Sequence, residues 1–262
     1  MSNLFRDLSS SIRNPEFWGL SGWLDIVVRY RQSRLGIFWL MAPAIIYVWG
    51  MGSFFASMQR ESIAAFAAHM AIGYTIFRLV SSVVIESTSA FTSAGPFIMD
   101  GHIRLTDFVL RVIAKALFYF VASIPVIVIA LAWYPSIRWE GVALALVSFP
   151  FVLANVLWVG VLFAVIGARF QDLSQFIGNI FMFAFLLTPI VWKASSMPLG
   201  SVRGTIARFN PLYHMVEIVR APILGEPLEP LSLYYLLFMA LVGWVLAALV
   251  YRRYARFVPI WI

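Results

Sequence analysis

Long apolar stretches separated by short polar loops dominate the chain. A helix needs about 20 apolar residues to cross the hydrocarbon core of a bilayer. Six stretches come close to this length, at residues 37–57, 66–85, 108–133, 142–166, 176–192 and 231–251. Transmembrane strands would instead alternate over about ten residues. The pattern therefore predicts an all-α integral membrane protein with six transmembrane helices, folded as a single domain over residues 1–262.

Composition supports a membrane location. Hydrophobic residues make up 62% of the chain and charged residues only 12%, with a mean hydropathy of +0.88. A soluble monomer rarely exposes large contiguous apolar patches, so this composition excludes a soluble fold. Cysteine is absent, which excludes disulfides, thiolate metal sites and cysteine catalysis. We predict no metal site and no catalytic residue in this chain.

The basic residues predict the orientation in the membrane. The net charge is +7, but these residues flank apolar spans and form no stripe on a soluble domain, so nucleic acid is not an expected partner. Cytoplasmic loops are enriched in Lys and Arg. With the N-terminus inside, the cytoplasmic segments hold twelve, namely Arg6, Arg13, Arg29, Arg31, Arg34, Arg104, Arg111, Lys115, Arg169, Arg252, Arg253 and Arg256. The outer segments hold six, namely Arg60, Arg138, Lys193, Arg203, Arg208 and Arg220. This bias predicts that both termini are cytoplasmic.

An amphipathic helix is predicted ahead of the first span, over residues 16–34. Its apolar positions recur at helical spacing and are Phe17, Leu20, Leu24, Val27 and Val28. Another face is polar and holds Ser21, Asp25, Arg29 and Gln32, with Asp25 and Arg29 at the spacing of a favourable i,i+4 pair. Such a helix lies in the membrane interface and does not cross it. Its role is either that of a simple anchor or that of a collar that fixes a transport pathway and contacts a cytoplasmic partner.

Four stretches spread over most of the chain share a further pattern. The first is DIVVRYRQSRLGIFW at 25–39, and the second is ARFQDL at 168–173 followed by LTPIVW at 187–192. The third is NPLY at 210–213, continuing with EIVRAPILG at 217–225, and the fourth is the tail, YARF at 254–257 and PIWI at 259–262. In this order they resemble the membrane subunits of ABC exporters that move polysaccharides, most closely those of the O-antigen exporters of Gram-negative bacteria.

The resemblance implies a homodimeric permease with six spans per chain and a separate ATPase subunit that binds ATP and Mg. The substrate would be a polysaccharide carried on polyprenyl diphosphate, moved from the cytoplasmic to the periplasmic leaflet of the bacterial inner membrane. The sequence supports this division of labour. Its only lysines are Lys115 and Lys193, and neither lies in a Gly-rich phosphate-binding loop. We therefore predict that the chain has no cofactor and is not an enzyme by itself.

Three regions are candidates for contact with the ATPase: the amphipathic helix, the loop 91–107 and the loop at 169–172. In loop 91–107 the resemblance implies a short coupling helix, and Gly95-Pro96 marks a break before three apolar residues. The alternatives are an ordinary turn with buried apolar residues in the first loop and a solvated helix cap in the second. The candidate residues are Asp25, Arg29, Arg31, Phe97, Ile98, Met99, Asp100, Arg169 and Asp172.

A translocating sugar chain needs a lining that binds weakly along its whole length. Aromatic faces suit this, because they offer an apolar plane to sugar C–H groups while their polar edges stay wet. Arg78 and Glu86 lie in or near the second span, and intramembrane charges usually face a cavity, a partner or a ligand. The alternatives are lipid-facing packing for the aromatic residues and an internal Arg78–Glu86 pair. The pathway candidates are Tyr30, Trp39, Tyr47, Trp49, Phe54, Phe55 and Arg78.

Segment 194–230, between spans five and six, is too charged for a span and too apolar for a free linker. Its apolar positions predict two short helices broken at Asn210-Pro211. The resemblance implies a periplasmic re-entrant hairpin at the exit, where non-helical backbone must be buried in protein or line a wet cavity. His214 is alternatively a satisfied polar residue, since no second ligand at metal-binding spacing accompanies it. The exit candidates are Arg203, Arg208, Asn210, His214 and Arg220.

Other functions remain as alternatives. A membrane prenyl-phosphate transferase would need paired carboxylates that bind a metal near the membrane surface, whereas the 12 acidic residues here are scattered. A stand-alone channel is disfavoured by the two loops suited to an ATPase. A permease for a teichoic-acid-like polymer, a capsule polymer or a small drug remains an alternative. The 25–39 block and the tail favour a long polymer, but they do not decide between these cargoes.

Overall fold

The computed structural model describes residues 3–101, 103–194, 197 and 200–262, and every regular element in this part of the chain is a helix. Four helical runs are long and apolar enough to cross a membrane. They are α5 (Ile63–Ser87), α7 (Leu105–Ala132), α8 (Trp139–Arg169) and α12 (Pro230–Tyr254), which continues into α13 (Val258–Trp261). These four coincide with the predicted spans at 66–85, 108–133, 142–166 and 231–251. The chain is therefore an all-α, multi-pass membrane protein.

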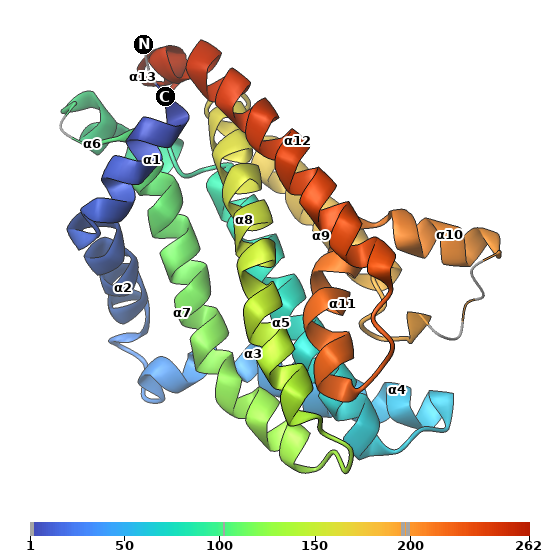
Figure 1. Cartoon of the computed structure of the whole chain (residues 1–262). Helices are drawn as coiled ribbons and strands as arrows, with labels where there is room; N and C mark the ends of the chain where they lie inside the picture. Colours follow the sequence, from blue (N-terminus) through green and yellow to red (C-terminus); the bar gives the residue numbers. More distant parts are fainter. Residues whose placement is uncertain (1–2, 102, 195–196, 198–199) are drawn as a thin grey trace.

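The first apolar stretch, at 37–57, is not one regular helix. It consists of a 3-10 turn (Gly36–Leu40), α3 (Ala42–Ile45), a π-helical turn (Ile46–Met51) and α4 (Gly52–Gln59). Pro43 lies in the first turn of α3, where its missing N–H is tolerated, and it limits how far a regular helix extends toward the N-terminus. Figure 1 shows this run crossing the lower end of the molecule at a steep angle to α7 and α8.

The fifth apolar stretch, at 176–192, is helical only as α9 (Leu173–Leu187). Its 15 residues rise about 22 Å, which is short of the hydrocarbon core of roughly 30 Å. The helix ends because Thr188 takes an extended conformation, with ψ 135°. Pro189 explains this end, since a proline disfavours the helical conformation of the residue before it.

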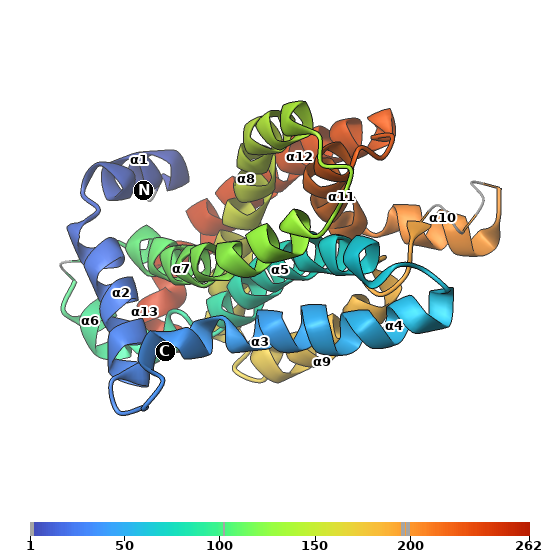
Figure 2. The same cartoon turned by 90° about the horizontal axis from the view of Figure 1, so that it is seen from below.

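Helix α5 lies at the centre of the bundle and is buried along most of its length. It contacts α4, α7, α8, α9 and α11 (Pro211–Leu224), and Figure 2 shows it enclosed by several of these neighbours. Helices α9 and α12 are different, because each leaves large apolar side chains exposed along one face. A bilayer or a second protein chain would cover such faces.

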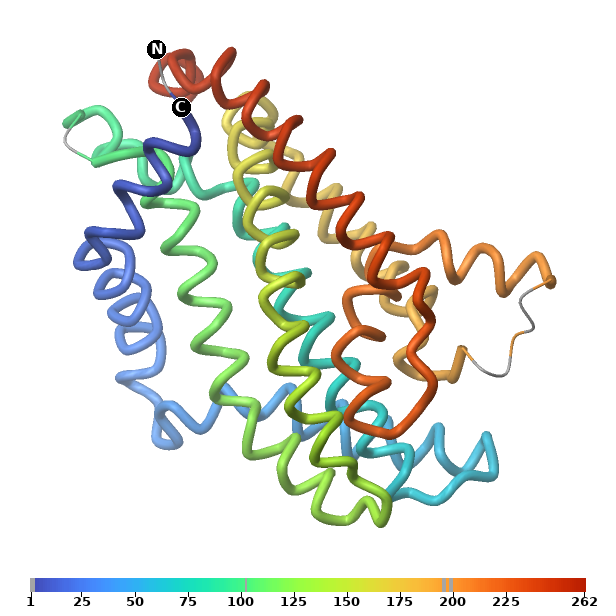
Figure 3. Tube along the Cα trace, in the orientation of Figure 1, coloured from blue at the N-terminus to red at the C-terminus, as the bar shows by residue number. Residues whose placement is uncertain are grey.

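Both termini lie at the same end of the molecule. Figures 1 and 3 place α1 (Leu4–Arg13), α6 (Gly95–Met99) and α13 near each other at this end, whereas the α7–α8 connection lies at the opposite end. Contacts of α1 with α7 and α12, and of α13 with α6 and α8, agree with this arrangement. The chain therefore has a terminal end, defined by α1, α6 and α13, and an opposite end at the α7–α8 connection.

Glycines allow three pairs of segments to approach closely. A Cβ atom on Gly167 of α8 would lie 1.9 Å from the carbonyl oxygen of Thr88, and one on Gly141 would lie 1.8 Å from that of Pro222. On α12, a Cβ atom on Gly243 would lie 2.1 Å from the Trp158 ring. Small residues at helix contacts are typical of membrane proteins, where van der Waals packing drives helix association.

Replacing Gly167 by alanine tests this packing. We expect Gly167→Ala to destabilise the protein by about 1–3 kcal/mol, because a backbone carbonyl must move to accept the methyl group. The matched control is Gly178→Ala in α9, where nothing lies within 4 Å and alanine favours the helix. Thermal unfolding of both variants in detergent, followed by tryptophan fluorescence, measures the difference, and equal midpoints would contradict the packing.

Candidate transport pathway and partner contacts

A cavity of about 330 Å³ lies between the π-helical turn, α5 and α9. We call it the aromatic groove; it is lined by Tyr47, Tyr74, Phe77, Arg78, Ser81, Ile85, Gly178, Phe181, Met182 and Phe185. Tyr47 and Tyr74 stack with ring centroids 4.4 Å apart, and the Phe185 ring meets Tyr47 edge-on at 5.5 Å. Phe77 packs edge-on against Phe185 at 5.4 Å. These geometries are favourable for aromatic pairs and give the groove a defined shape.

Arg78 borders the aromatic groove and is only partly buried. Its Nη1 atom donates a hydrogen bond to the Leu40 carbonyl at 3.2 Å, and its guanidinium lies 5.2 Å from the centre of the Tyr119 ring, a cation–π contact. The expected internal pair with Glu86 is not formed, because Glu86 pairs with Lys115 of α7. The guanidinium of Arg78 therefore has no carboxylate partner among the described residues and keeps donors available to a ligand.

Of the pathway candidates, the structure brings together Tyr47 and Arg78. The other five lie outside the aromatic groove: Tyr30, Trp39, Trp49, Phe54 and Phe55. Trp49 packs against Trp133 at the end of α7, with centroids 4.9 Å apart, and Phe54 is mostly exposed. Trp39, Trp49, Phe54 and Phe55 lie elsewhere on the irregular 36–59 run, and Tyr30 lies in the helix before it.

Apart from Arg78, sequence reasoning missed the groove residues of α5 and α9. Tyr74, Phe77 and Arg78 lie three and four residues apart, the spacing of one helix face. Phe181 and Phe185 show the same spacing on α9. This signal was present around Arg78, but only the tertiary structure shows that the two faces meet.

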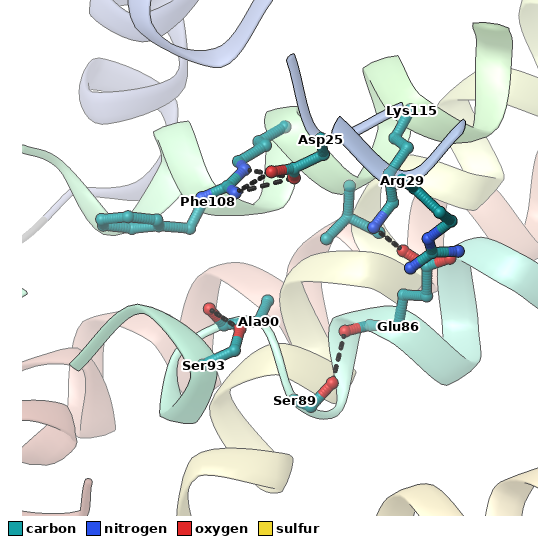
Figure 4. A pocket seen from close by; sticks show the side chains of 10 residues that line it. Asp25, Arg29, Glu86, Ser89, Ala90, Ser93, Phe108 and Lys115 are labelled. Carbon is teal, nitrogen blue, oxygen red and sulfur yellow. Dashed lines mark hydrogen bonds and ion pairs between the residues drawn. The ribbon is translucent and has the colours of Figure 1, made fainter. Parts of the chain in front are cut away.

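A second cavity, of about 320 Å³, lies between α2 (Glu16–Tyr30), α5 and α7 and is strongly charged. Figure 4 shows Asp25, Arg29, Glu86 and Lys115 gathered around it. The Asp25 carboxylate accepts hydrogen bonds from Nε and Nη2 of Arg111, at 2.9 and 2.6 Å. Such a two-pronged contact is the strong form of a carboxylate–arginine pair. Arg29 donates to the Tyr119 hydroxyl at 3.3 Å.

The polar face of α2 therefore points toward α7. The predicted Asp25–Arg29 pair is wrong, since Asp25 pairs with Arg111. The apolar residues Leu20, Leu24 and Val28 are exposed at 61%, 47% and 66%. An apolar outer face suits a helix surrounded by lipid. Asp25 and Arg29, which were predicted to contact the ATPase, line the charged cavity, and Arg29 and Arg31 are both exposed.

The loop 91–107 contains a short helix, α6, as expected for a coupling helix. Phe97 and Met99 are exposed at 54% and 62%, and Asp100 follows at the exposed end of the helix. Ile98 is buried, so one of the three apolar residues anchors the helix and two face outward. Residue 102 of this loop lies outside the described residues.

The turn between α8 and α9 exposes Arg169 and Asp172. The Arg169 guanidinium lies 5.9 Å from the Trp261 ring centre, so the turn contacts α13. Helix α13 also contacts α6. The turn, α6 and α13 thus form one continuous surface at the terminal end of the molecule.

Two helices meet at Asn210, as predicted from the break at Asn210-Pro211: α10 (Val202–Phe209) and α11. The Asn210 Oδ1 atom accepts from the Leu212 amide at 3.0 Å and caps α11, while Nδ2 donates to the Thr188 hydroxyl at 2.9 Å. Asn210 is therefore a structural residue at this junction. Residues 195–196 and 198–199 of the predicted hairpin lie outside the described residues.

Among the remaining exit candidates, three are held by internal contacts. Arg220 is 1% exposed; it donates to Glu217 at 2.7 Å, to the Pro189 carbonyl at 2.6 Å and to His69 Nε2 at 3.1 Å. Arg208 pairs with Glu229, and its hydrogen bonds to that carboxylate raise the pKa of Arg208.

His214 is buried between the Arg208 carbonyl, 2.7 Å from Nε2, and the Ser232 hydroxyl, 2.9 Å from Nδ1. Burial lowers the pKa of His214, so the neutral ring is favoured, and this residue is the satisfied polar group of the alternative interpretation. Arg203, on α10, is the exit candidate whose side chain is exposed.

Comparison with known proteins defines the class. The family model of the ABC-2 type transporter matches residues 18–224, which is most of the chain and includes the aromatic groove, the charged cavity and α11. The chain therefore belongs to the ABC-2 type transporter family of transporter membrane subunits.

The names of two relatives describe a more specific function than the family description does. The chain is similar to the O-antigen export system permease protein RfbA of Klebsiella pneumoniae, with 25% identity over 199 residues, 73% of this chain and 74% of the relative. It is also similar to the protein of the same name from Myxococcus xanthus, with 23% identity over 201 residues, 75% of this chain and 76% of the relative.

The Asp25–Arg111 pair is testable by a double-mutant cycle. We expect Asp25→Ala and Arg111→Ala each to lower the thermal midpoint, and the double variant to lower it less than the sum. The coupling should be about 1 kcal/mol, because the pair is two-pronged but partly exposed. Additive effects would contradict the pair. A cycle on Asp172 and Arg169, for which no ion pair is seen among the described residues, serves as the control.

Proposed function

We propose that this chain is the transmembrane subunit of an ATP-driven exporter that moves polyprenyl-diphosphate-linked, O-antigen-like polysaccharide across the bacterial inner membrane. The observation that carries the proposal is the similarity to O-antigen export permeases over about three quarters of both chains. Membership of a transporter membrane family over residues 18–224 excludes the prenyl-phosphate transferase as the primary activity. Within the family, a permease for a teichoic-acid-like polymer, a capsule polymer or a small drug is the second candidate.

The aromatic groove supports a sugar substrate. Its stacked and edge-on rings present apolar planes against which sugar rings pack without strong fixed contacts. Arg78 at its border adds a planar cation with free donors, which suits a phosphate group better than a sugar ring. In this proposal the groove guides the glycan, and Arg78 meets the diphosphate of the lipid carrier.

The proposed protein has six spans per chain and works as a homodimer. The proposed first span is the run from Gly36–Leu40 to α4, which is steeply inclined to α7 and α8, and the proposed fifth span is α9 continued by the extended residues after it. Helix α9 exposes Phe176, Met182 and Phe183, on the helix that also lines the aromatic groove. A second copy that covers this face would close the groove into a channel between the two chains.

Both termini are proposed to be cytoplasmic, with α10 and α11 as a periplasmic re-entrant hairpin. The twelve-to-six bias of Lys and Arg supports this orientation. The location of α1, α6 and α13 at one end of the bundle agrees with an even number of crossings. Helix α11, with Arg220 and His214, is buried along most of its length, as a re-entrant segment enclosed by protein would be.

The proposed partner is a separate nucleotide-binding subunit that binds ATP and Mg. The surface formed by α6, the α8–α9 turn and α13 is the proposed contact, with Phe97 and Met99 inserted into the ATPase and Arg169 and Asp172 beside them. Exposed apolar side chains on a polar loop at the cytoplasmic end would be costly without such a partner.

Depletion of the protein tests the proposed function. We expect polyprenyl-diphosphate-linked polysaccharide to accumulate inside the cells while long-chain glycan disappears from the surface. Both pools are measured by lipid extraction and by surface labelling, and chemical analysis of the accumulated lipid identifies the sugar. Unchanged levels of both pools would reject the polysaccharide assignment and favour another cargo.

Substitution of Arg78 tests the pathway. We expect Arg78→Ala to reduce export at least about tenfold, because the loss of one charged hydrogen-bond donor to phosphate costs about 1.5 kcal/mol or more. Arg78→Lys should retain most export, since lysine also binds phosphate as a point charge. The control is Arg13→Ala, an exposed arginine outside both cavities. Normal export by Arg78→Ala, at normal protein levels in the membrane, would remove Arg78 from the pathway.

A further inference from the structure

A third cavity, of about 960 Å³, opens at the terminal end between α1, the start of α7 and the end of α12. Its charged and polar lining residues are Asp7, Arg104, Tyr251, Arg252, Arg253 and Arg256. We call it the arginine cavity. None of these residues belongs to the aromatic groove or to the charged cavity between α2, α5 and α7, so the arginine cavity is a separate feature.

The cations of the arginine cavity outnumber its carboxylates. None of its four arginines forms an ion pair with any residue that the structure describes. The one carboxylate in the lining, Asp7, accepts a hydrogen bond from the Tyr251 hydroxyl at 3.0 Å. Four guanidinium groups against one carboxylate leave a formal charge of +3 in the lining. Such a cavity favours an anion that accepts several hydrogen bonds, and a phosphate group is the common biological example.

An apolar groove of about 790 Å³ continues from the arginine cavity along α1 and α12. The two share Leu249 and Arg252, so they are contiguous. The apolar groove is lined mainly by Leu4, Phe5, Leu237, Leu241, Trp244 and Val245. Phe5 and Trp244, which both line it, are in contact, with ring centroids 5.8 Å apart. A ligand that fills both spaces must therefore join an anionic head to an apolar tail.

We propose that the site between α1 and α12 binds one anionic phospholipid, with its phosphate in the arginine cavity and an acyl chain in the apolar groove. A free phosphate would leave the groove empty, and a neutral lipid would leave four arginines without a counter-ion. Helix α12 can span the membrane, and the arginines at its end fall at the depth of the lipid headgroups. Basic pockets between transmembrane helices on the cytoplasmic side bind acidic headgroups in this way. The inference goes beyond the export proposal, because the site contains no residue of the proposed pathway.

Native mass spectrometry of the full chain in mild detergent tests the site. The probes are phosphatidylglycerol and phosphatidylcholine with identical acyl chains. We expect the wild type to prefer phosphatidylglycerol, and Arg252→Gln with Arg256→Gln to weaken its binding about 30-fold, since each arginine near an anionic surface contributes about fivefold. Binding of phosphatidylcholine should not change. The control is Arg6→Gln with Arg13→Gln, which removes two exposed arginines of α1 that line neither space.

Two further measurements separate a built site from other sources of binding. Val245→Trp fills the apolar groove without changing a charge, and it should weaken phosphatidylglycerol binding while the four arginines remain. Arg252→Lys with Arg256→Lys should keep most of the binding and shows that the chain folds. Equal weakening by the α1 control would reveal diffuse surface charge and overturn the proposal. Full displacement of the lipid by inorganic phosphate would reassign the cavity to a free anion, and displacement by a polyprenyl phosphate would reassign it to the transport substrate.

Discussion

A charge that is removed from water must find its partners within the protein, and Arg220 is the clearest case here. Its guanidinium binds Glu217 on α11, His69 on α5 and the Pro189 carbonyl just after α9. One side chain thus fixes the positions of three segments that are far apart in the sequence. Loss of one partner from a buried pair is strongly destabilising because the other charge stays buried. The placement of α11 against the central helix, and with it the whole segment after α9, depends on this cluster.

The same constraint explains why Asp25 of α2 faces α7. In water an amphipathic helix buries its apolar face, whereas α2 exposes Leu20, Leu24 and Val28, as suits contact with lipid, and pairs Asp25 with Arg111 inside the protein. Arg111 and Lys115 lie inside an apolar helix and are neutralised by Asp25 and Glu86 from two different neighbours. Helices α2, α5 and α7 are therefore held together by two ion pairs as well as by packing. One pair joins α2 to α7, and the other joins α5 to α7.

The four long helical runs, the short helix α6 and the helix pair joined at Asn210 could be predicted from the sequence, because each depends on local apolar length, proline or capping. The partners of the charged residues could not. Spacing suggested Asp25 with Arg29 and Arg78 with Glu86, but residues brought close by the fold, Arg111 and Lys115, compete successfully for the two carboxylates. The irregular 36–59 run was missed because its hydropathy is that of an ordinary span. Eight of the ten residues that line the aromatic groove were missed, because the faces of α5 and α9 that carry them meet only in three dimensions.

The contact between Gly167 and Thr88 joins two backbones with no side chain between them. A side chain can change rotamer and absorb a small displacement, but two main chains in direct contact cannot. Thr88 leads into the loop that carries α6, and Gly167 is followed within five residues by the α8–α9 turn. The loop that carries α6 and the α8–α9 turn are therefore joined through a backbone contact that leaves little room for relative movement. A displacement of either element would therefore be transmitted to α5 and α8 together, and the helix that carries Arg78 would move with the surface.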